Sequence, residues 1–409
     1  MKIIESNDSS MNSKKLGDII RENKKSKLLV SEASNTGEYP FYNSSQKLTM
    51  SHNDFLLDGV KIVLSTGGDY SSLHLTDGKF AHSSDTYVVE SNDDEILTEY
   101  IYYFLVINKN MLDRCFEGTK LKHLNKKMLK KEYVPYPDIE TQKKIITLLN
   151  SHKSYLQSIQ TLISKMEQRN QYYFDKIFFG EIRFNKNGEV YDNSDWKSVT
   201  MNGYNKDIPK EWSISSLEDV VCLEKGVNIP VSELNYDGGI QYLRSGDIWE
   251  KASSSKDNLY YSGDDSKKIT YKSKEEWIIC FDGYNTNPFN GTIGLVTNYG
   301  EGTLSGRLYK IKGIDKKSLE FVNVALLQSL YMKNIFFRFS EGSMSKSVTK
   351  HAKKFDFPVI PMEEQVHINN FSKKLLDEVD LLKRLYLKEK QVFQWLCEKL
   401  VSGEYKIEE

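Results

Sequence analysis

Two clusters of basic side chains are the residues whose types and spacing best fit a chemical task. One lies within residues 114–131, where Glu117 is the single acidic residue, and the other lies within residues 333–354, where Glu341 is the single acidic residue. Such groups can follow the phosphates of a nucleic acid, or they can form an ordinary solvated face. Because both clusters occupy the same place in a repeated sequence, phosphate binding becomes a serious alternative to the solvated face.

No recognisable catalytic apparatus accompanies these clusters. The sequence has no G-x-x-x-x-G-K-[ST] phosphate loop, no H-E-x-x-H motif and no paired cysteines. Asn287-Pro288-Phe289 is superficially similar to the Asn-Pro-Pro-aromatic motif of amino-methylating DNA methyltransferases, but it lacks the second proline and a preceding glycine-rich loop. We therefore interpret it as a turn, and we expect a non-enzymatic chain that binds no metal and no cofactor itself.

Composition indicates a soluble protein of two or three domains. A chain of 409 residues is too long for one hydrophobic core. Its net charge of −1 and its 39% of hydrophobic residues are typical of a soluble globular protein. Four widely spaced cysteines argue against a disulfide framework or a zinc site and for a reducing compartment. The polar start predicts no signal peptide, and no apolar run reaches the ~20 residues of a membrane span, so we expect a cytoplasmic protein without membrane contact.

Much of the sequence recurs within the chain. Residues near the start of the first copy recur at a displacement of 201 positions, and residues near its end recur at a displacement of 223 or 224. Both copies end in a similar hexapeptide. Two copies of so long a unit give one chain a near two-fold axis, as in a dimer, with two similar but unequal faces. The matched positions include Leu16 and Leu217, Gly37 and Gly238, Ser44 and Ser245, Glu117 and Glu341, Lys122 and Lys346, Lys126 and Lys350, and Pro137 and Pro361.

Each copy is predicted to open with a mixed α/β domain. In the first copy, residues 60–64 and 86–89 have the pattern of strands and residues 97–106 that of an aromatic helix. In the second copy, the expected elements are strands over 241–244, 277–281 and 307–311 and a helix over 321–332.

Each copy then closes with one long helix, predicted over residues 138–180 and 362–402. Apolar residues recur at alternating steps of four and three, which is a heptad seam, and Gly180 and Gly403 stand where C-caps are expected. Ordinary helical-bundle packing remains an alternative for either helix alone. Two such helices at equivalent places favour an antiparallel coiled coil that acts as a spacer. The predicted seam comprises Ile145, Leu149, Leu156, Ile159, Ile163, Met166, Leu375, Val379, Leu382 and Leu396.

The predicted fold class is therefore α/β (α+β), with a pseudo-two-fold internal repeat. A polar segment over residues 1–15, disordered or an extension, precedes a recognition domain over 16–137 and the helix over 138–180. A linker over 181–216 leads to a second recognition domain over 217–361, the helix over 362–402 and a tail over 403–409.

The repeat resembles the specificity subunit of Type I restriction-modification systems. Pro137-Asp138-Ile139-Glu140-Thr141-Gln142 and Pro361-Met362-Glu363-Glu364-Gln365 are similar to the proline and Glu-Gln opening of that family's conserved helices. The stretch from Glu341-Gly342-Ser343 to Pro361 resembles the end of a target-recognition domain, and residues 241–248 resemble a block near its start. The first copy departs from the pattern at Thr141, which splits the Glu-Gln pair.

The resemblance implies a DNA-reading role in phage defence. Each domain would read half of a bipartite, asymmetric site in double-stranded DNA, and the helices would set the gap and dock two methyltransferase subunits. Two motor-nuclease subunits would complete the complex, and the methyl donor, ATP and magnesium would belong to these partners. The base-reading candidates are Tyr70, Ser72, His74, Tyr284, Asn285 and Asn287. The phosphate candidates are Lys120, Lys122, Lys126, Arg338, Lys346 and Lys350.

Two other classes remain open. One is the DNA-reading subunit of a related restriction system that cuts on both sides of its site. The other is a non-catalytic scaffold that binds proteins through two recognition domains, against which the matched basic clusters argue.

Overall fold

The computed structural model divides into two compact units. Unit 1 comprises Met1–Ile159 with Lys388–Glu409, and unit 2 comprises Gln160–Leu387, so that each long helix belongs partly to each unit. The structure describes residues 2–5, 11–46, 48–68, 71–118, 122–192, 195–244, 259–263, 276–284, 292–296, 302–314, 318–340, 345–347 and 349–408.

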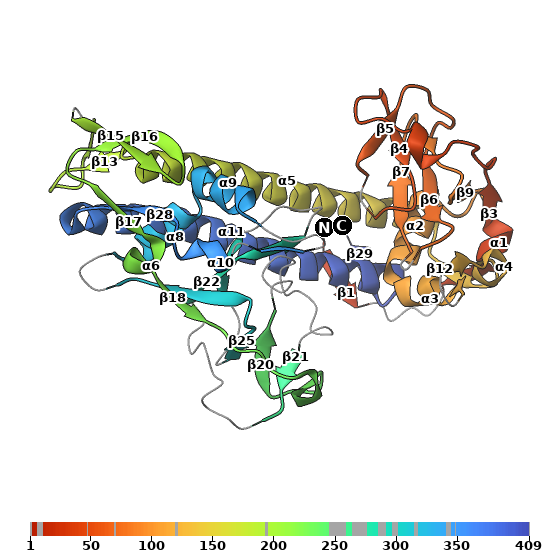
Figure 1. The fold of residues 1–409 in the computed structure, drawn as a ribbon. Coiled ribbons are helices and arrows are strands. Elements are labelled where there is room, and N and C mark those ends of the chain that lie inside the picture. The colour runs from red at the N-terminus through yellow and green to blue at the C-terminus, as the bar shows by residue number, and fades with distance from the viewer. Residues whose placement is uncertain are drawn as a thin grey trace. The chain divides into compact units, whose positions relative to one another are not determined.

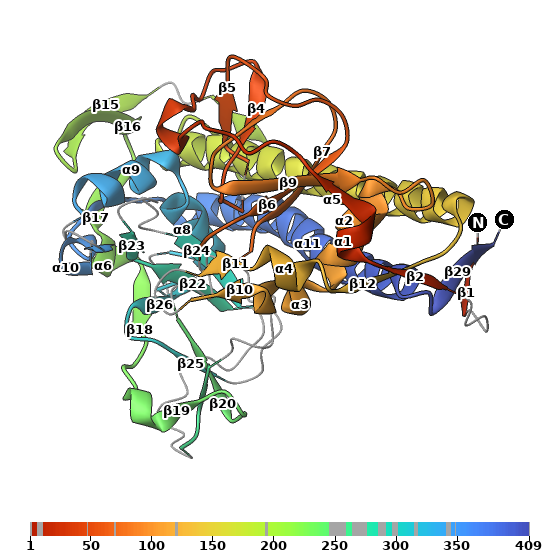
Figure 2. The same ribbon diagram turned by 90° about the vertical axis from the view of Figure 1, so that its right-hand side faces the viewer.

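Unit 1 is built on an antiparallel sheet with the strand order β3-β9-β6-β7 (Figure 1). Strand β6 (Lys61–Ser65) is buried throughout, and α2 (Thr98–Ile107) packs on β6 and β7 (Figure 2). A second sheet, β5-β4-β8, contains one parallel pair, β4 with β8. The other elements before the first long helix are β1 (Lys2–Glu5), β2 (Asn12–Lys15), α1 (Leu16–Ile19), β3 (Ile20–Glu22), η1 (Val30–Glu32), β4 (Tyr39–Tyr42), β5 (Met50–His52), β7 (Leu73–Thr76), β8 (Ala81–His82), β9 (Thr86–Ser91), α3 (Lys109–Arg114), β10 (Phe116–Glu117), β11 (His123–Leu124), α4 (Lys126–Leu129) and β12 (Tyr133–Tyr136).

Unit 2 repeats this topology. Its main sheet has the order β18-β26-β22-β24, and its second sheet, β19-β21-β20-β25, again contains one parallel pair, β20 with β25. The internal repeat of the sequence is therefore a repeat of the fold. The elements are β13 (Arg183–Phe184), β14 (Val190–Tyr191), β15 (Trp196–Met201), β16 (Tyr204–Pro209), β17 (Ser213–Ser216), α6 (Leu217–Val220), β18 (Cys222–Lys225), η2 (Val231–Glu233), β19 (Leu234–Asn235), β20 (Ile240–Leu243), β21 (Leu259–Tyr261), β22 (Glu276–Cys280), β23 (Asp282–Tyr284), β24 (Thr292–Val296), β25 (Gly302–Leu304), β26 (Leu308–Lys312), α8 (Glu320–Leu327), α9 (Leu330–Arg338), β27 (Ser345–Ser347), α10 (Thr349–Ala352) and β28 (Asp356–Val359).

The predicted strands correspond to β6, β9, β20, β22 and β26, and the helix over 97–106 corresponds to α2. The single helix expected over 321–332 is wrong, because α8 ends at Leu327 and α9 begins at Leu330. Ser329 separates them, and its hydroxyl accepts a hydrogen bond from the backbone N–H of Met332 at 3.2 Å. A serine at this position caps a new helix in preference to continuing the old one.

The two long helices are α5 (Ile139–Phe178) and α11 (Met362–Val401), each of 40 residues. In unit 1, Nε2 of His152 lies 3.0 Å from the carbonyl oxygen of Glu389, and in unit 2 the amide of Asn170 donates to the carbonyl of Leu375 at 2.8 Å. The residue numbers of the contacting positions rise along α5 as they fall along α11, so the two helices run antiparallel. This confirms the predicted fold class. Among the described residues, no helix is both long and apolar enough to span a membrane.

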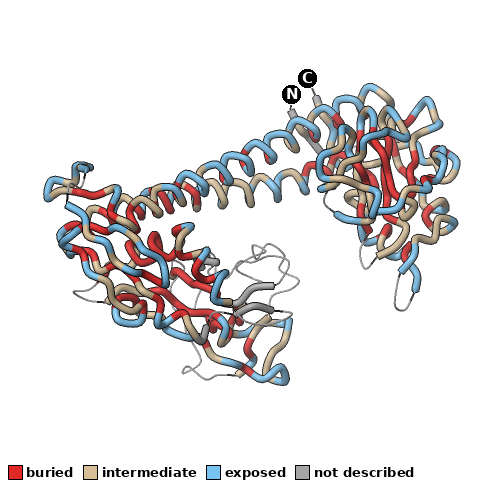
Figure 3. Tube along the Cα trace, turned by 45° about the horizontal axis from the view of Figure 1, so that its top comes forward, coloured by how far each residue is buried: buried red, intermediate tan, exposed pale blue. Residues whose placement is uncertain are grey.

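Buried positions recur along both helices at the spacing of a seam (Figure 3). The amino-terminal part of α5 and the carboxyl-terminal part of α11 join the core of unit 1, whereas their other parts join the core of unit 2. Gly180 and Gly403 follow the helices with φ angles of 72° and 79°, as a C-cap requires. Of the predicted seam residues, Met166 and Leu382 are half-buried, and Ile145, Leu149, Leu156, Ile159, Ile163, Leu375, Val379 and Leu396 are buried.

The polar amino-terminal segment is ordered where the structure describes it. Strand β1 pairs with β29 (Tyr405–Glu408), and β2 pairs with β12. Of the two expectations for this segment, disorder or an extension, disorder does not hold for residues 2–5 and 12–15. The expected linker over 181–216 likewise contains the hairpin β15–β16 and the strand β17, which pairs with β28.

Candidate nucleic-acid interface

In unit 1, the loop that follows the central strand β6 lies against β11. Gly67 forms an antiparallel bridge with His123, the N–H of Gly68 donates to the carbonyl of Lys122 at 3.2 Å, and the N–H of Leu124 donates to Thr66 at 3.0 Å. A Cβ atom at Gly67 would lie 3.3 Å from Nδ1 of His123, so the close approach favours glycine. The predicted base-reading loop and the first basic cluster are therefore neighbours.

Unit 2 has the corresponding ladder. After the central strand β22, β23 pairs antiparallel with β27, so that Gly283 faces Lys346 and Tyr284 faces Ser345. The candidate base-reading segment again lies beside the candidate phosphate-binding segment. We call the two arrangements, residues 66–68 with 122–124 and residues 282–284 with 345–347, the recognition ladders.

The predicted phosphate ligands fall in different settings. Lys122 is exposed at the unit 1 ladder. Arg338 is exposed at the end of α9, where its guanidinium lies 4.7 Å from the ring centroid of Tyr204. Lys346 and Lys350 belong to β27 and α10, but their side chains lie outside the described residues, as does all of Lys120.

Lys126 is already partly neutralised within the chain. Its ammonium lies 3.2 Å from a carboxylate oxygen of Glu22 and 3.9 Å from the ring centroid of Tyr87. Glu22 also pairs with Lys130 at 2.5 Å. The hydrogen bond from Lys130, followed by that from Lys126, lowers the pKa of Glu22 to about 2, against the desolvation that opposes it. Glu22 therefore stays ionised and offsets positive charge beside the ladder.

The predicted base-reading residues are only partly described. Ser72 is 2% exposed, its backbone N–H donates to the hydroxyl of Ser65, and burial at this depth argues against direct base contact in this structure. His74 is half-buried on β7 and its Nε2 lies 2.9 Å from the carbonyl oxygen of Ser45. Tyr284 lies in β23 with its side chain outside the described residues, and Tyr70, Asn285 and Asn287 lie wholly outside them. The assignment of base-reading residues stays a prediction.

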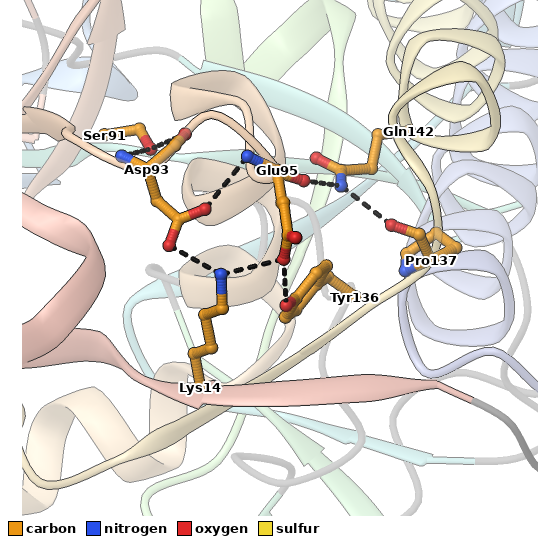
Figure 4. Close-up of polar contacts among 7 residues, drawn as sticks. All are labelled: Lys14, Ser91, Asp93, Glu95, Tyr136, Pro137 and Gln142. Atoms are coloured by element: carbon orange, nitrogen blue, oxygen red, sulfur yellow. Dashed lines mark hydrogen bonds and ion pairs between the residues drawn. The ribbon is translucent and has the colours of Figure 1, made fainter.

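A buried glutamine ties the recognition domain of unit 1 to the start of α5 (Figure 4). Gln142 is 0% exposed, and its amide group donates to the carbonyl oxygens of Glu95 at 2.7 Å and Pro137 at 2.9 Å. Its side-chain oxygen accepts the N–H of Leu97, the residue before α2, at 2.9 Å.

An ion-pair network supports the loop that Gln142 holds. Nζ of Lys14 lies 2.8 Å from carboxylate oxygens of both Asp93 and Glu95, and the hydroxyl of Tyr136 donates to Glu95 at 2.8 Å (Figure 4). These contacts join β2, the loop before α2 and β12. The hydrogen bonds from Lys14 lower the pKa of both carboxyl groups, so the network is charged at neutral pH.

The same glutamine arrangement occurs in unit 2. Gln365 is 1% exposed, accepts the N–H of Leu319, the residue before α8, at 2.8 Å, and donates to the carbonyl of Ile360 at 2.8 Å. We name the two sites the glutamine clamps. In the sequence alone, these glutamines serve only as marks of a resemblance. Their recurrence at a displacement of 223 is the signal that could have identified a shared structural task.

Unit 2 carries a second buried polar contact that the sequence analysis missed. Arg183 on β13 binds Glu364 in the first turn of α11 with two hydrogen bonds, at 3.0 and 2.8 Å, and the indole N–H of Trp212 donates to the same carboxylate at 3.1 Å. The side chains of Arg183 and Glu364 are 4% and 5% exposed. Thr141 occupies the equivalent position in the first copy and donates instead to Asp138.

Within the described residues, no group of three or more histidine, cysteine, aspartate or glutamate side chains could hold a metal ion. The arrangement offers binding chemistry: in each unit a lysine-bearing segment pairs with a backbone segment that follows the central strand, and Lys122 in unit 1 is exposed.

The fold and the paired sites thus define a tandem recognition protein in which two related α/β modules are each joined to a long helix. The chain belongs to the family of the Type I restriction modification DNA specificity domain, whose model matches residues 8–168 and 209–388.

The similar proteins agree with this membership. The Type I restriction enzyme MjaVIII specificity subunit of Methanocaldococcus jannaschii is 22% identical over 263 residues, which cover 58% of this chain and 57% of that protein. The MjaIX specificity subunit of the same organism is 26% identical over 155 residues, covering 37% of this chain and 34% of that protein. This chain therefore matches about half or less of the length of these curated relatives.

A solved structure shares the fold. The crystal structure of the Type I restriction-modification system S subunit from M. genitalium has a TM-score of 0.57 and 17% sequence identity, and the match covers 97% of each chain.

Proposed function

We propose that this chain is the non-catalytic subunit that reads DNA sequence for a Type I restriction-modification complex. Each recognition domain reads one half of a bipartite site in double-stranded DNA. The observation that carries the proposal is the pair of recognition ladders, because both units place a candidate base-reading segment beside a lysine-bearing segment. Phosphate contacts would set the register on the duplex, and polar groups at base edges would supply the specificity.

The antiparallel helices would fix the gap between the two half-sites. A helix of 40 residues measures about 60 Å at ~1.5 Å per residue, which is between one and two turns of DNA. Domains separated by such a ruler would read half-sites on one face of the duplex, and the base pairs between them would stay unread.

The outer faces of the helices would dock two copies of one methyltransferase subunit. Tyr172 on α5 and Trp395 on α11 are equivalent in the repeat, and they are 58% and 40% exposed. Large exposed aromatic side chains are frequent anchors of protein interfaces, and two equivalent anchors suit the same partner bound twice. Two motor-nuclease subunits would complete the complex in the cytoplasm. The partner subunits, and not this chain, would bind the methyl donor, ATP and magnesium.

Selection from random duplex DNA tests the proposal. The chain is mixed with its methyltransferase partner, bound DNA is recovered and sequenced, and the partner alone serves as the control. The proposal predicts a motif of two short specific halves separated by a fixed unread gap, present only with this chain. Recovery of a single contiguous motif, or of the same DNA with the partner alone, would contradict it.

A further inference from the structure

The glutamine clamps connect parts of the chain that are distant in sequence. Gln142 reaches Glu95 and Leu97, which lie 47 and 45 residues earlier, as well as Pro137 just before its own helix. In unit 2, Gln365 reaches Leu319, 46 residues earlier. A hydrogen bond to the carbonyl of Pro137 alone would stabilise only the local turn at the start of the helix. The long-range contacts therefore indicate a second task, which is to join the recognition domain to the helix.

The contacts are suited to fix an orientation. Each clamp holds the N–H of the residue that precedes the aromatic helix, and each is buried, so water does not compete for its hydrogen bonds. In unit 1 three hydrogen bonds converge on the single side chain of Gln142, and the Lys14 network holds Glu95 from the other side. A planar amide bonded to both a donor and acceptors has little freedom to rotate.

We propose that Gln142 and Gln365 are positioning residues that set how strictly the complex discriminates the length of the gap between the half-sites. This inference rests on the proposed function. Adding one base pair moves a half-site by about 3.4 Å and turns it by about a tenth of a turn. A domain fixed rigidly on its helix cannot follow that movement, whereas a domain released from its clamp can pivot toward a displaced half-site.

The test uses the complete chain with its methyltransferase partner and DNA duplexes in which both half-sites are constant and the gap is the native length or one base pair shorter or longer. Dissociation constants are measured for the native chain and for Gln142→Ala. We expect the preference of the variant for the native gap over the altered gaps to fall about tenfold, equivalent to ~1.4 kcal/mol, with base preferences within each half-site unchanged. Gln142→Glu keeps an acceptor for the N–H of Leu97 but sets a buried carboxylate oxygen against the carbonyl oxygens of Glu95 and Pro137, so its preference should fall at least as far as that of Gln142→Ala.

A matched core variant separates positioning from general loss of stability. Val63→Ala removes two methyl groups from the fully buried centre of β6, away from the clamp. It should lower the thermal midpoint while leaving the gap preference of the native chain intact. Gln142 variants that weaken binding to all gaps equally, as a merely structural role predicts, would overturn the inference. If the native chain itself does not bind a bipartite site, the proposed function is wrong. That result is obtained from the native chain alone, so it is distinguished from a failure of the inference about the glutamine clamps.

Discussion

The buried pair of Arg183 and Glu364 offers the sharpest test of how α11 is anchored in unit 2. Replacing Glu364 with alanine removes both hydrogen bonds to the guanidinium and leaves the indole N–H of Trp212 without its acceptor. Arg183 would keep its ion pair with Glu211, at 2.6 Å, whose side chain is 50% exposed. Thr141→Ala is the control, because Thr141 holds the same place in the repeat.

The structure sets the magnitude of this effect. Removing one partner of a buried ion pair costs about 3–5 kcal/mol, and an unsatisfied buried donor adds to the cost, whereas the remaining Glu211 offsets part of it. We expect Glu364→Ala to destabilise unit 2 by about 4 kcal/mol, or roughly 8–16 °C in its unfolding midpoint for a unit of this size. Thr141→Ala should cost about 0.5–1.5 kcal/mol, the ordinary worth of one hydrogen bond.

Thermal unfolding followed by calorimetry and by tryptophan fluorescence measures both variants. A double variant, Arg183→Met with Glu364→Leu, removes both charges and should recover much of the loss, since an apolar pair of similar volume often replaces a buried ion pair without penalty. Equal midpoints for Glu364→Ala and Thr141→Ala would show that the buried ion pair does not anchor α11, as would a double variant less stable than Glu364→Ala.

Three further predictions concern pH, salt and assembly. Burial lowers the pKa of His82 below its ordinary 6.5, so the stability that the neutral imidazole contributes is present above pH 6.5 and is lost as the pH falls below that value. The urea midpoints at pH 7.5 and pH 5.5 should therefore differ less in His82→Gln than in the native chain, and an unchanged difference would contradict this. Glu22→Gln should release Lys126 and Lys130, tighten DNA binding and steepen the slope of log K against log salt by about 0.9 per added phosphate contact. Lys122→Ala should flatten that slope by a similar amount, and unchanged slopes would exclude phosphate contacts at these lysines. Tyr172→Ala and Trp395→Ala should each reduce the methyltransferase copies per chain from two to one, as measured by light scattering, and retention of both copies in the double variant would rule out these anchors.

The long helices could be predicted from sequence because their signal is local. The heptad spacing and the glycines that follow the helices define both elements within about two residues of α5 and α11. The central strands were similarly readable, since β6 and β22 are apolar runs bounded by turn residues. The break between α8 and α9 was not, because Ser329 is a weak helix breaker until tertiary packing favours its use as a cap.

The candidate site could be predicted only in part, because its geometry depends on contacts distant in sequence. The bridge between Gly67 and His123 joins positions 56 residues apart, and no local sequence pattern predicts such a pairing. Ser72 follows a glycine-rich loop but is buried, which periodicity alone did not indicate. The clamps of Gln142 and Gln365 leave a trace only in the repeat, where both glutamines return at equivalent positions.

Whether this protein reads the DNA sequence is tested by sequencing the methylated bases in the genome of a host. The host carries the methyltransferase partner either with this chain or without it. We expect one bipartite methylated motif with a fixed gap, present only when this chain is expressed. The same methylated motif without the chain would contradict the claim that this protein reads the DNA sequence.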